Sequence, residues 1–564
     1  MIVLLQLIWK YRFHYVIVIP AILLILLFKF LPFGSGIYLS LIDYKPFLGI
    51  FGSPWVGFGH YADLFAEPAF RQALANTLAV KLGYMLLTSV LAFAIAMALS
   101  AIPSFRARSW LTSILLIPYV IPSIVTAYLV MLVLSVNEAP LFPVHTLVLG
   151  DAALFRPVLI LVEALKTCGI PAVIALAAIT AARASDLRSG RTSTALKSGV
   201  IPALRAIAAF LLLQLSTLLS PGFELVWLLQ NPLVMETADT LDTFISRTGN
   251  FNGQFSLAEA AWVVQFAIQL ACTAAAYLLV RRFFLADLFG SPVPQAGGRE
   301  TDAAESVRSG AVGIKAAGTV LTLIFAGAAL LPVYLLFVYP FVSDGGSVSL
   351  PENFTVGSFA GFAALYIPVT AVYLLLAVTL AYPLTVRRLP GRGVYKAFLL
   401  TAALLGPATL HEFVQFNSLG MTGTLLPVLL GGVFPYVSVF VIKGFFNSRY
   451  ADLKAQAEET GRGELHAFFT LFIPKIWRLL AGLGILQFIW LWNGIYANLI
   501  YIIDPGRYSP ATRFFLLMRP AEESLPTADI LLYGGLVSLP PILLLLFFRR
   551  WLTPEAYVSQ IRNL

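Results

Sequence analysis

Long apolar runs, each of about twenty residues, recur along the whole chain and are separated by short polar connections. A helical run of this length matches the hydrocarbon thickness of a bilayer, and a helix satisfies its own backbone hydrogen bonds in lipid. The pattern therefore predicts an all-α membrane protein with about twelve transmembrane helices. The runs lie at about 15–35, 77–101, 110–135, 157–181, 203–229, 257–280, 316–342, 361–386, 396–415, 424–446, 477–502 and 528–548.

Basic residues mark every second connection between the runs. They begin with Lys10 and Arg12 before the first run and end with Arg549 and Arg550 after the twelfth. Since Lys and Arg concentrate in cytoplasmic loops, we expect both termini of this multi-pass chain to lie in the cytoplasm. The net charge of +9 follows from the same topology, and no nucleic-acid partner is expected.

The composition excludes a large soluble domain and gives no sign of catalysis. Charged residues make up only 12% of the 564 residues, against about 25% in soluble domains. The five histidines are scattered and the two cysteines lie singly in apolar runs, so no metal site is predicted. The phosphate-binding P-loop pattern is absent. We therefore expect this chain to carry no enzyme activity, cofactor or metal of its own.

A segment rich in Gly, Pro and Ser, Gly290–Gly310, divides the twelve runs into two sets of six. Short motifs repeat in the two sets: VIPALR precedes the fifth run and FIPKIWR the eleventh, and a second proline follows 30 and 31 residues later, respectively. The repeat predicts two homologous halves, at 1–285 and 313–564, joined by a cytoplasmic linker at 286–312. Two such halves in one chain would form a pathway at their interface.

One cytoplasmic connection has the pattern of an amphipathic helix. Leu465, Phe468, Phe469 and Phe472 recur on one helical face, and Pro474 then permits a new helix to start into the membrane. We expect this aromatic face to be exposed and to need cover. Two alternatives remain. The helix would either lie flat on the lipid headgroups or bind in a groove on a soluble partner protein.

This segment resembles the cytoplasmic loop of ABC importer permeases, whose signature places a proline thirteen residues after a glycine. Gly461 and Pro474 have that spacing, and Ala457 matches a signature alanine. Gly190 and Pro202 form a weaker counterpart in the first half, twelve residues apart. In the family this loop is the coupling helix that docks on an ATP-hydrolysing subunit.

Further stretches are similar to permeases of the carbohydrate, or multi-sugar, class. They are WVGFGHYADLF and SPGFELVWLLQNPLVMETADTLDTFISRTGNFNGQFS in the first half, and LPENFTVGSF, YPLTVRRLPGRG and FIWLWNGIYANLIYIIDPGRY in the second. Each half resembles one of the two permease subunits of that class, as if the two were fused. The resemblance implies the type I importer fold, an oligosaccharide substrate and a place in the bacterial cytoplasmic (inner) membrane. It also implies an external solute-binding protein, docking on loops such as Asn231–Ser256, and two separate ATP-binding subunits that hold ATP and Mg.

The resemblance directs attention to polar and aromatic residues within the runs, because a sugar pathway needs aromatic faces and fixed hydrogen-bonding groups. Glu163 and Lys166 lie inside the fourth run. They either line a pathway, where Lys166 would suit an acidic sugar, or pair with each other. The other pathway candidates are Glu224, Trp227, Gln230, Gln487, Trp490, Trp492, Asn493 and Asn498. The alternative is that the Trp side chains form a belt at the membrane surface and the amides join helices.

Two sets of six runs are also compatible with a secondary transporter of the major facilitator type, driven by an ion gradient. That family carries a Gly-Asp-Arg pattern between its second and third helices, which IPSFRARSW lacks. Amphipathic cytoplasmic segments after the fourth and tenth runs are not expected there either. The sequence therefore favours the ABC importer and leaves the identity of the sugar open.

Overall fold

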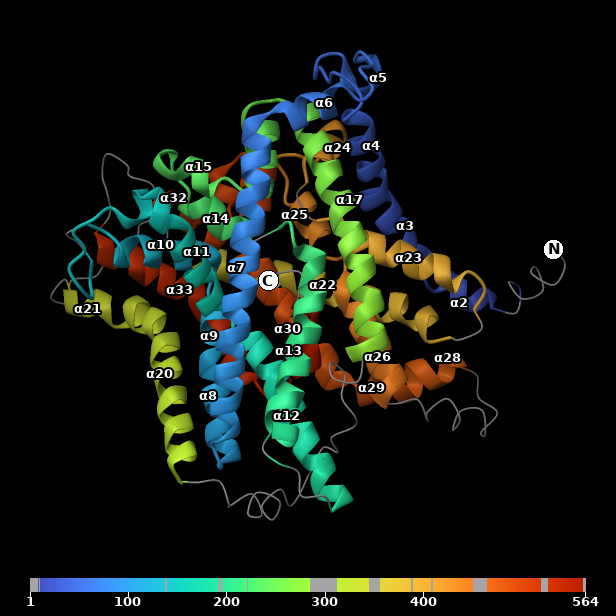
Figure 1. Cartoon of the computed structure of the whole chain (residues 1–564). Helices are drawn as coiled ribbons and strands as arrows, with labels where there is room; N and C mark the ends of the chain where they lie inside the picture. Colours follow the sequence, from blue (N-terminus) through green and yellow to red (C-terminus); the bar gives the residue numbers. More distant parts are fainter. Residues whose placement is uncertain are drawn as a thin grey trace.

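The computed structural model describes residues 9, 11–136, 139–190, 194, 196–220, 222–284, 312–343, 356–386, 389–406, 409–449, 464–518 and 526–560. Figure 1 shows long helices running side by side, with shorter helices packed across them. Extended pairing within these ranges is limited to one isolated bridge between Ile42 and Trp55. The expectation of an all-α membrane protein is therefore confirmed.

In the first half of the described chain, α2, α3 and α4 follow one another with little change of direction (Figure 1). The long helices α7, α12 and α17 come later in this half. Its elements are α2 (Arg12–Val16), α3 (Ile19–Ile25), η1 (Leu26–Phe30), α4 (Leu31–Leu39), α5 (Gly49–Gly52), α6 (Gly59–Ala66), α7 (Pro68–Ser100), α8 (Phe105–Leu115), α9 (Ile117–Val120), α10 (Ser123–Val133), η2 (Val148–Gly150), α11 (Ala152–Thr167), α12 (Gly169–Ser189), η3 (Leu196–Val200), α13 (Ile201–Gln214), η4 (Leu215–Thr217), α14 (Phe223–Leu229), η5 (Pro232–Val234), α15 (Met235–Ala238), α16 (Leu241–Ser246), η6 (Arg247–Phe251), α17 (Phe255–Leu279) and η7 (Val280–Phe284).

The second half repeats the alternation of long helices and short connecting ones. Its elements are α20 (Val312–Phe337), α21 (Tyr339–Ser343), α22 (Val356–Thr385), α23 (Arg392–Ala402), α24 (Leu410–Ser418), α25 (Leu426–Gly431), α26 (Tyr436–Arg449), α28 (Glu464–His466), η8 (Ala467–Phe472), α29 (Ile473–Lys475), α30 (Trp477–Asn493), α31 (Tyr496–Tyr501), η9 (Pro505–Arg507), α32 (Pro510–Leu517), α33 (Thr527–Phe547) and α34 (Pro554–Val558).

The apolar runs form membrane-length helices, but fewer than twelve are continuous. Among the described residues nine helices are long and apolar enough to cross a membrane, or up to eleven if two bent pairs each count as one span. The bends are 88° after Val120 and 72° before Trp477. Ile121, the residue before Pro122, is in extended conformation, as is favoured before a proline, and α9 therefore ends at Val120. The run expected at about 396–415 is instead split into α23 and α24.

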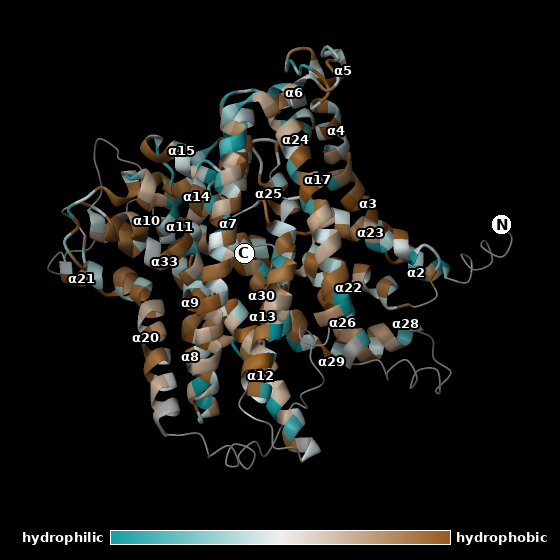
Figure 2. Ribbon diagram, in the orientation of Figure 1, coloured by the Kyte–Doolittle hydropathy of each residue, from teal (hydrophilic) through white to brown (hydrophobic). Residues whose placement is uncertain are grey.

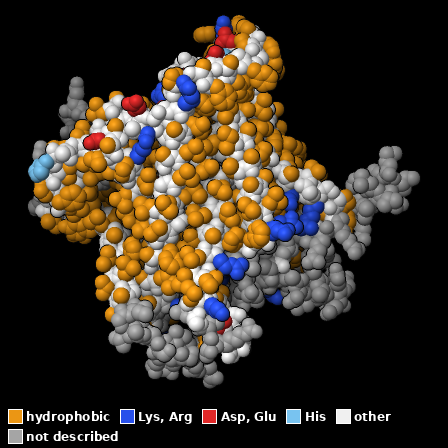
Figure 3. Space-filling model, in the orientation of Figure 1, with side chains coloured by type: hydrophobic (Ala, Val, Ile, Leu, Met, Phe, Trp, Pro, Cys, Tyr) orange, Lys and Arg blue, Asp and Glu red, His pale blue; other side chains and the backbone are white. Residues whose placement is uncertain are grey.

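The surface agrees with a bilayer setting. Figure 2 shows apolar residues along the long helices, with hydrophilic residues more frequent towards their ends. In the face drawn in Figure 3, a broad zone of hydrophobic side chains separates charged side chains above from others below. Side chains that face lipid tails need not be polar, so this hydrophobic zone fits the hydrocarbon layer of a membrane.

Each half is covered by the first helix of the other. The N-terminal helix packs through α3 on α22 and through α4 on α24, while α20, which opens the second half, packs on α7 and α8. Gly318 of α20 approaches so closely that an added Cβ would lie 2.9 Å from the Cβ of Ala101. A buried ion pair between Lys29 and Glu412 also joins the halves, with side chains 2% and 3% exposed. The two halves are therefore interlocked.

We predict that Gly482→Ala destabilises the protein by about 1–3 kcal/mol, the usual cost of overpacking. Gly482 lies in α30, and an added Cβ would fall 2.5 Å from the carbonyl oxygen of Trp551, a backbone atom that cannot rotate away. Gly327→Ala in α20 is the matched control, since its Cβ would meet nothing within 4 Å. Thermal unfolding in detergent measures both. Equal melting temperatures for the two variants would contradict the close packing of α30 on the C-terminal segment.

Candidate functional site

A cavity of about 1450 Å³ lies between the two halves. Its walls come from α11, α14, α16 and α17 in the first half and from α23, α26, α30 and α31 in the second. Its titratable, amide and aromatic lining side chains include Tyr119, Glu163, Lys166, Glu224, Asp242, Asn250, Trp262, Gln265, Gln269, Tyr277, Arg281, Arg282, Arg392, Lys396, Lys443, Trp490, Asn493, Tyr496, Asn498, Tyr501 and Gln560.

Glu163 and Lys166, two of the three ionisable residues of α11, line this cavity. Lys166 is 9% exposed, and its Nζ donates to Ser123 Oγ at 2.8 Å. Glu163 faces Gly222, whose backbone is left-handed and where an added Cβ would lie 3.1 Å from Glu163 Oε1. Lys166 also lies within electrostatic range of Glu163 and Glu224. Both residues therefore line the cavity, and Glu163 attracts Lys166 electrostatically, but no ion pair joins the two side chains in the described structure.

Polar contacts join the halves where α30 breaks before α31; we call these contacts the inter-half seam. Glu224 Oε1 accepts from the backbone N–H of Ile495 at 3.2 Å. Asn493 Nδ2 donates to the carbonyl oxygen of Val120 at 2.9 Å. The hydroxyl of Tyr496 lies 2.6 Å from Ser246 Oγ and accepts from Asn250 Nδ2 at 3.0 Å. Glu224 thereby satisfies a backbone N–H left free by the helix break in the second half, and Asn493 satisfies a carbonyl at the end of α9 in the first half.

The ten predicted pathway residues separate into two groups. Glu163, Lys166, Glu224, Trp490, Asn493 and Asn498 lie in the cavity wall, whereas Trp227, Gln230, Gln487 and Trp492 are outside the lining found in the described chain. Gln487 Nε2 donates to the carbonyl oxygen of Gly432 at 2.7 Å, and Trp492 Nε1 to that of Val537 at 2.9 Å. Trp227 stacks on Phe515 with ring centroids 5.5 Å apart. Gln487 therefore joins two helices, as the alternative for the amides expected, while Trp227 and Trp492 contact residues of other helices.

One polar stripe in the wall was not recognised from the sequence. Gln265, Gln269, Thr273 and Tyr277 follow one another at intervals of four along α17, and all four line the cavity. Residues four apart share a helix face, so their spacing inside an apolar run is a signal that could have been used. Gln265 Nε2 donates to Asp242 Oδ1, which ties this stripe to α16.

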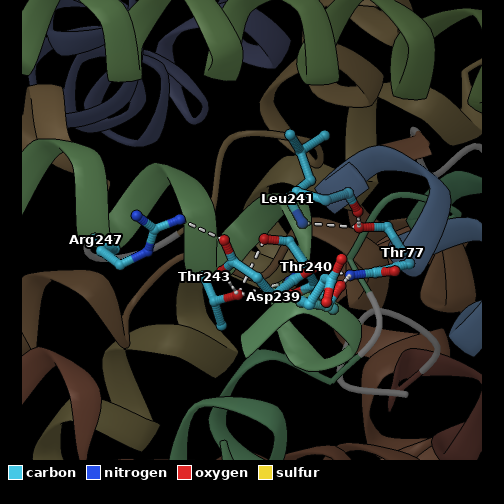
Figure 4. A network of polar contacts seen from close by, with 9 residues as sticks. Thr77, Asp239, Thr240, Leu241, Thr243 and Arg247 are labelled. Carbon is cyan, nitrogen blue, oxygen red and sulfur yellow. Dashed lines mark hydrogen bonds and ion pairs between the residues drawn. The ribbon is translucent and has the colours of Figure 1, made fainter. Parts of the chain in front are cut away.

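The connection between α14 and α17, expected to face a solute-binding protein, is held by a buried hydrogen-bond network (Figure 4). Asp239 pairs with Arg247 and accepts from Thr243 Oγ1 at 2.8 Å. The N–H of Leu241 donates to Thr77 Oγ1 in α7 at 2.7 Å. Buried backbone groups without partners are costly, so these bonds fix the short helices α15 and α16 on the end of α7.

The aromatic face predicted for docking is already covered within the chain. Phe468 and Phe472 are fully buried, and their rings lie 5.6 and 4.5 Å from the ring of Phe446 in α26. Tyr382 of α22 adds a further contact, 5.0 Å from Phe468. Leu465 and Phe469 are half-buried. The expectation of an exposed stripe is therefore wrong for Phe468 and Phe472, because α26 and α22 cover these rings.

Of the other predicted docking positions, the structure describes Gly190, Pro202 and Pro474. Pro474 is exposed in the first turn of α29. Thr470 of η8, which was not predicted as a docking residue, is exposed as well. In the first half, Gly190 ends α12 in left-handed conformation and Pro202 starts α13. Ala457 and Gly461 lie outside the described residues, as does nearly all of the expected linker at 286–312.

The known proteins similar to this chain each match about half of it or less. No protein-family model matches it. The polygalacturonan/rhamnogalacturonan transport system permease protein YteP of Bacillus subtilis (strain 168) is 29% identical over 285 residues, which are 48% of this chain and 88% of that protein. The arabinooligosaccharides transport system permease protein AraQ of Halalkalibacterium halodurans is 25% identical over 36% of this chain and 74% of its own length. A bacterial alginate ABC transporter structure aligns with 49% of this chain at 25% identity and a TM-score of 0.42.

These relatives favour the ABC importer over the major facilitator alternative, since they are permeases of sugar transport systems. YteP is matched over most of its length by less than half of this chain. Helices of membrane length run through both halves of the described chain. The homologues of this multi-pass membrane protein are therefore permeases of sugar ABC transporters, and because each matches about half of the chain or less, its length is consistent with two permeases fused in one chain.

Proposed function

We propose that this chain is a transmembrane subunit of an ABC importer for oligosaccharides. The cavity between the halves carries the proposal, because its wall combines carboxylates, amides and aromatic rings from both. Its volume of about 1450 Å³ exceeds the roughly 300–1,000 Å³ typical of pockets for drug-sized ligands. A chain of several sugar units is a suitable occupant.

The relatives suggest which sugars and partners to test. YteP is named for polygalacturonan and rhamnogalacturonan, polymers that contain uronic acids, so short oligogalacturonides are the first substrates to try. An external solute-binding protein would deliver the sugar to the loop held by Asp239 and Thr77. Two ATP-binding subunits, holding ATP and Mg, would dock on the segments around Pro202 and Pro474 from the cytoplasm, where both termini would also lie.

Packing contacts connect η8, in the second proposed docking segment, with the cavity wall. Phe468 and Phe472 of η8 pack on Phe446 of α26. The same helix contributes Val437, Phe440 and Lys443 to the cavity wall. Since packed aromatic side chains move together with their backbone, displacement of η8 by an ATP-binding subunit would displace α26 and change the cavity. The inter-half seam would then open at the opposite wall.

The proposal is tested with the full chain purified from its native membranes. We expect ATP-binding subunits to co-purify, and proteoliposomes with the solute-binding protein outside and Mg-ATP inside to accumulate labelled oligogalacturonide. A hydrolysis-deficient ATP-binding subunit should abolish uptake. Uptake that needs no ATP and instead follows an imposed proton or sodium gradient would contradict the proposal and support the secondary-transporter alternative.

A further inference from the structure

Four basic side chains from both halves meet in one part of the cavity wall; we call Arg281, Arg392, Lys396 and Lys443 the basic cluster. Arg281 lies in η7, Arg392 and Lys396 in α23, and Lys443 in α26. Arg281, Arg392 and Lys396 all lie within electrostatic range of Lys443. Lys396 Nζ sits 4.8 Å from the ring centre of Tyr277, the last member of the polar stripe on α17.

The basic cluster is far from the acidic side chains of the same cavity. Asp242 accepts a hydrogen bond from Gln265 of α17. Arg281 follows Gln265 by sixteen residues along α17 and η7, which places it about 24 Å farther along the helix axis. Glu163 and Glu224 lie near Lys166, and Lys81 lies near both Glu163 and Asp242. Each of these three carboxylates therefore has a lysine side chain nearby.

The described structure gives the basic cluster no carboxylate of its own. The carboxylates in the described cavity wall are Glu163, Glu224 and Asp242. Arg392 donates to the carbonyl oxygen of Leu384 at 2.7 Å, a neutral acceptor that supplies no compensating charge. Like charges held together raise the local potential and attract counter-ions. The preference for Lys and Arg in cytoplasmic loops accounts for the number of basic residues in these segments. It does not require the basic side chains to face a cavity shared by the two halves.

We propose that the basic cluster is a binding site for the carboxylates of an acidic oligosaccharide. Arg281 and Arg392 offer planar guanidinium groups that can hold a carboxylate by two parallel bonds. Lys396 and Lys443 add point charges, and Tyr277 adds an aromatic face for a sugar ring. The inference rests on the proposed function and adds to it a specific site, at which uronate units are recognised at the end of the cavity away from Asp242.

The test compares two ligands of equal length on the full chain in detergent, namely trigalacturonate and its fully methyl-esterified, uncharged form. We expect Lys396→Gln/Lys443→Gln to bind trigalacturonate about tenfold more weakly or worse, because charge-assisted hydrogen bonds are lost. Affinity for the ester should stay the same. Lys443→Arg should retain acid binding, and so should Arg106→Gln, which removes an exposed charge in α8 outside the cavity lining. Calorimetry measures binding without ATP-binding subunits.

Unchanged preference for the acid over the ester in the double Gln variant would overturn the site. An anionic lipid headgroup is the other source of the same chemistry. To test this source, the stability of each protein is measured in anionic and in zwitterionic lipid vesicles. If only the unmodified protein is more stable in anionic vesicles, and the double Gln variant keeps its preference for the acid, the cluster binds lipid and the inference is wrong. If the unmodified protein binds the acid in preference to the ester but takes up neither ligand in an ATP-driven assay, the result would instead contradict the proposed function.

Discussion

Replacing Lys29 with methionine is expected to destabilise the protein by about 3–5 kcal/mol, because breaking a buried ion pair leaves the other charge without compensation. Lys29 and Glu412 are almost completely buried, and Lys29 Nζ also donates to the carbonyl oxygen of Gly406 at 3.1 Å. The pair joins the N-terminal helix to α24. We therefore expect Lys29→Met to lower the melting temperature in detergent and to loosen the two halves from each other.

A matched control is available on the surface. Lys45 and Asp43 form an ion pair at 3.5 Å with side chains 55% and 51% exposed, and exposed pairs contribute about 0–1 kcal/mol. Lys45→Met should therefore melt close to the unmodified protein. The double variant Lys29→Met/Glu412→Leu should recover most of the lost stability, since it leaves no lone buried charge. Equal effects of the two single Lys variants would show that the buried pair does not hold the halves together.

The second large effect is expected at η8. Phe468→Asp should prevent accumulation of folded protein, because it removes a buried ring, which alone costs about 3–5 kcal/mol, and places a carboxylate among Tyr382, Phe446 and Phe472. Size-exclusion chromatography of the detergent extract measures the folded fraction. Phe468→Leu, which keeps an apolar side chain, should retain most of it.

Thr470→Asp separates folding from coupling. Thr470 is exposed in the same turn of η8, and exposed substitutions usually change stability by less than about 0.5 kcal/mol. This variant should fold normally and lose ATP-driven uptake if an ATP-binding subunit docks there. Normal folding of Phe468→Asp would contradict the burial of the aromatic face, while normal uptake by Thr470→Asp would remove this surface from the docking site.

The fold class was predictable because its cause is local. An apolar run of about twenty residues must be helical in lipid whatever surrounds it, so α7, α17, α22 and α33 follow from composition alone. The run at about 396–415 did not form one helix. It contains His411 and Glu412, which bind Glu259 and Lys29 from the other half. Partners so distant in sequence cannot be identified from periodicity.

The candidate site was predictable only in part, for the same reason. Ionisable residues inside a run, such as Glu163 and Lys166, are costly in lipid and therefore point to a polar interior. Trp227 and Trp492 looked equivalent to Trp490 in sequence, yet only Trp490 lines the cavity, because helix rotation depends on neighbours. The pattern of η8 correctly gave one apolar face, but it could not show that Phe446 covers that face.

The ion pair between Lys29 and Glu412 also sets a timing requirement on biosynthesis. The two residues are 383 positions apart, and ribosomes add about 5–20 residues per second. Lys29 therefore enters the membrane about 20–80 s before its carboxylate exists. During that interval its ammonium group must stay near the headgroups, in water or beside the insertion machinery. The first helix can reach its final position only after α24 has been made.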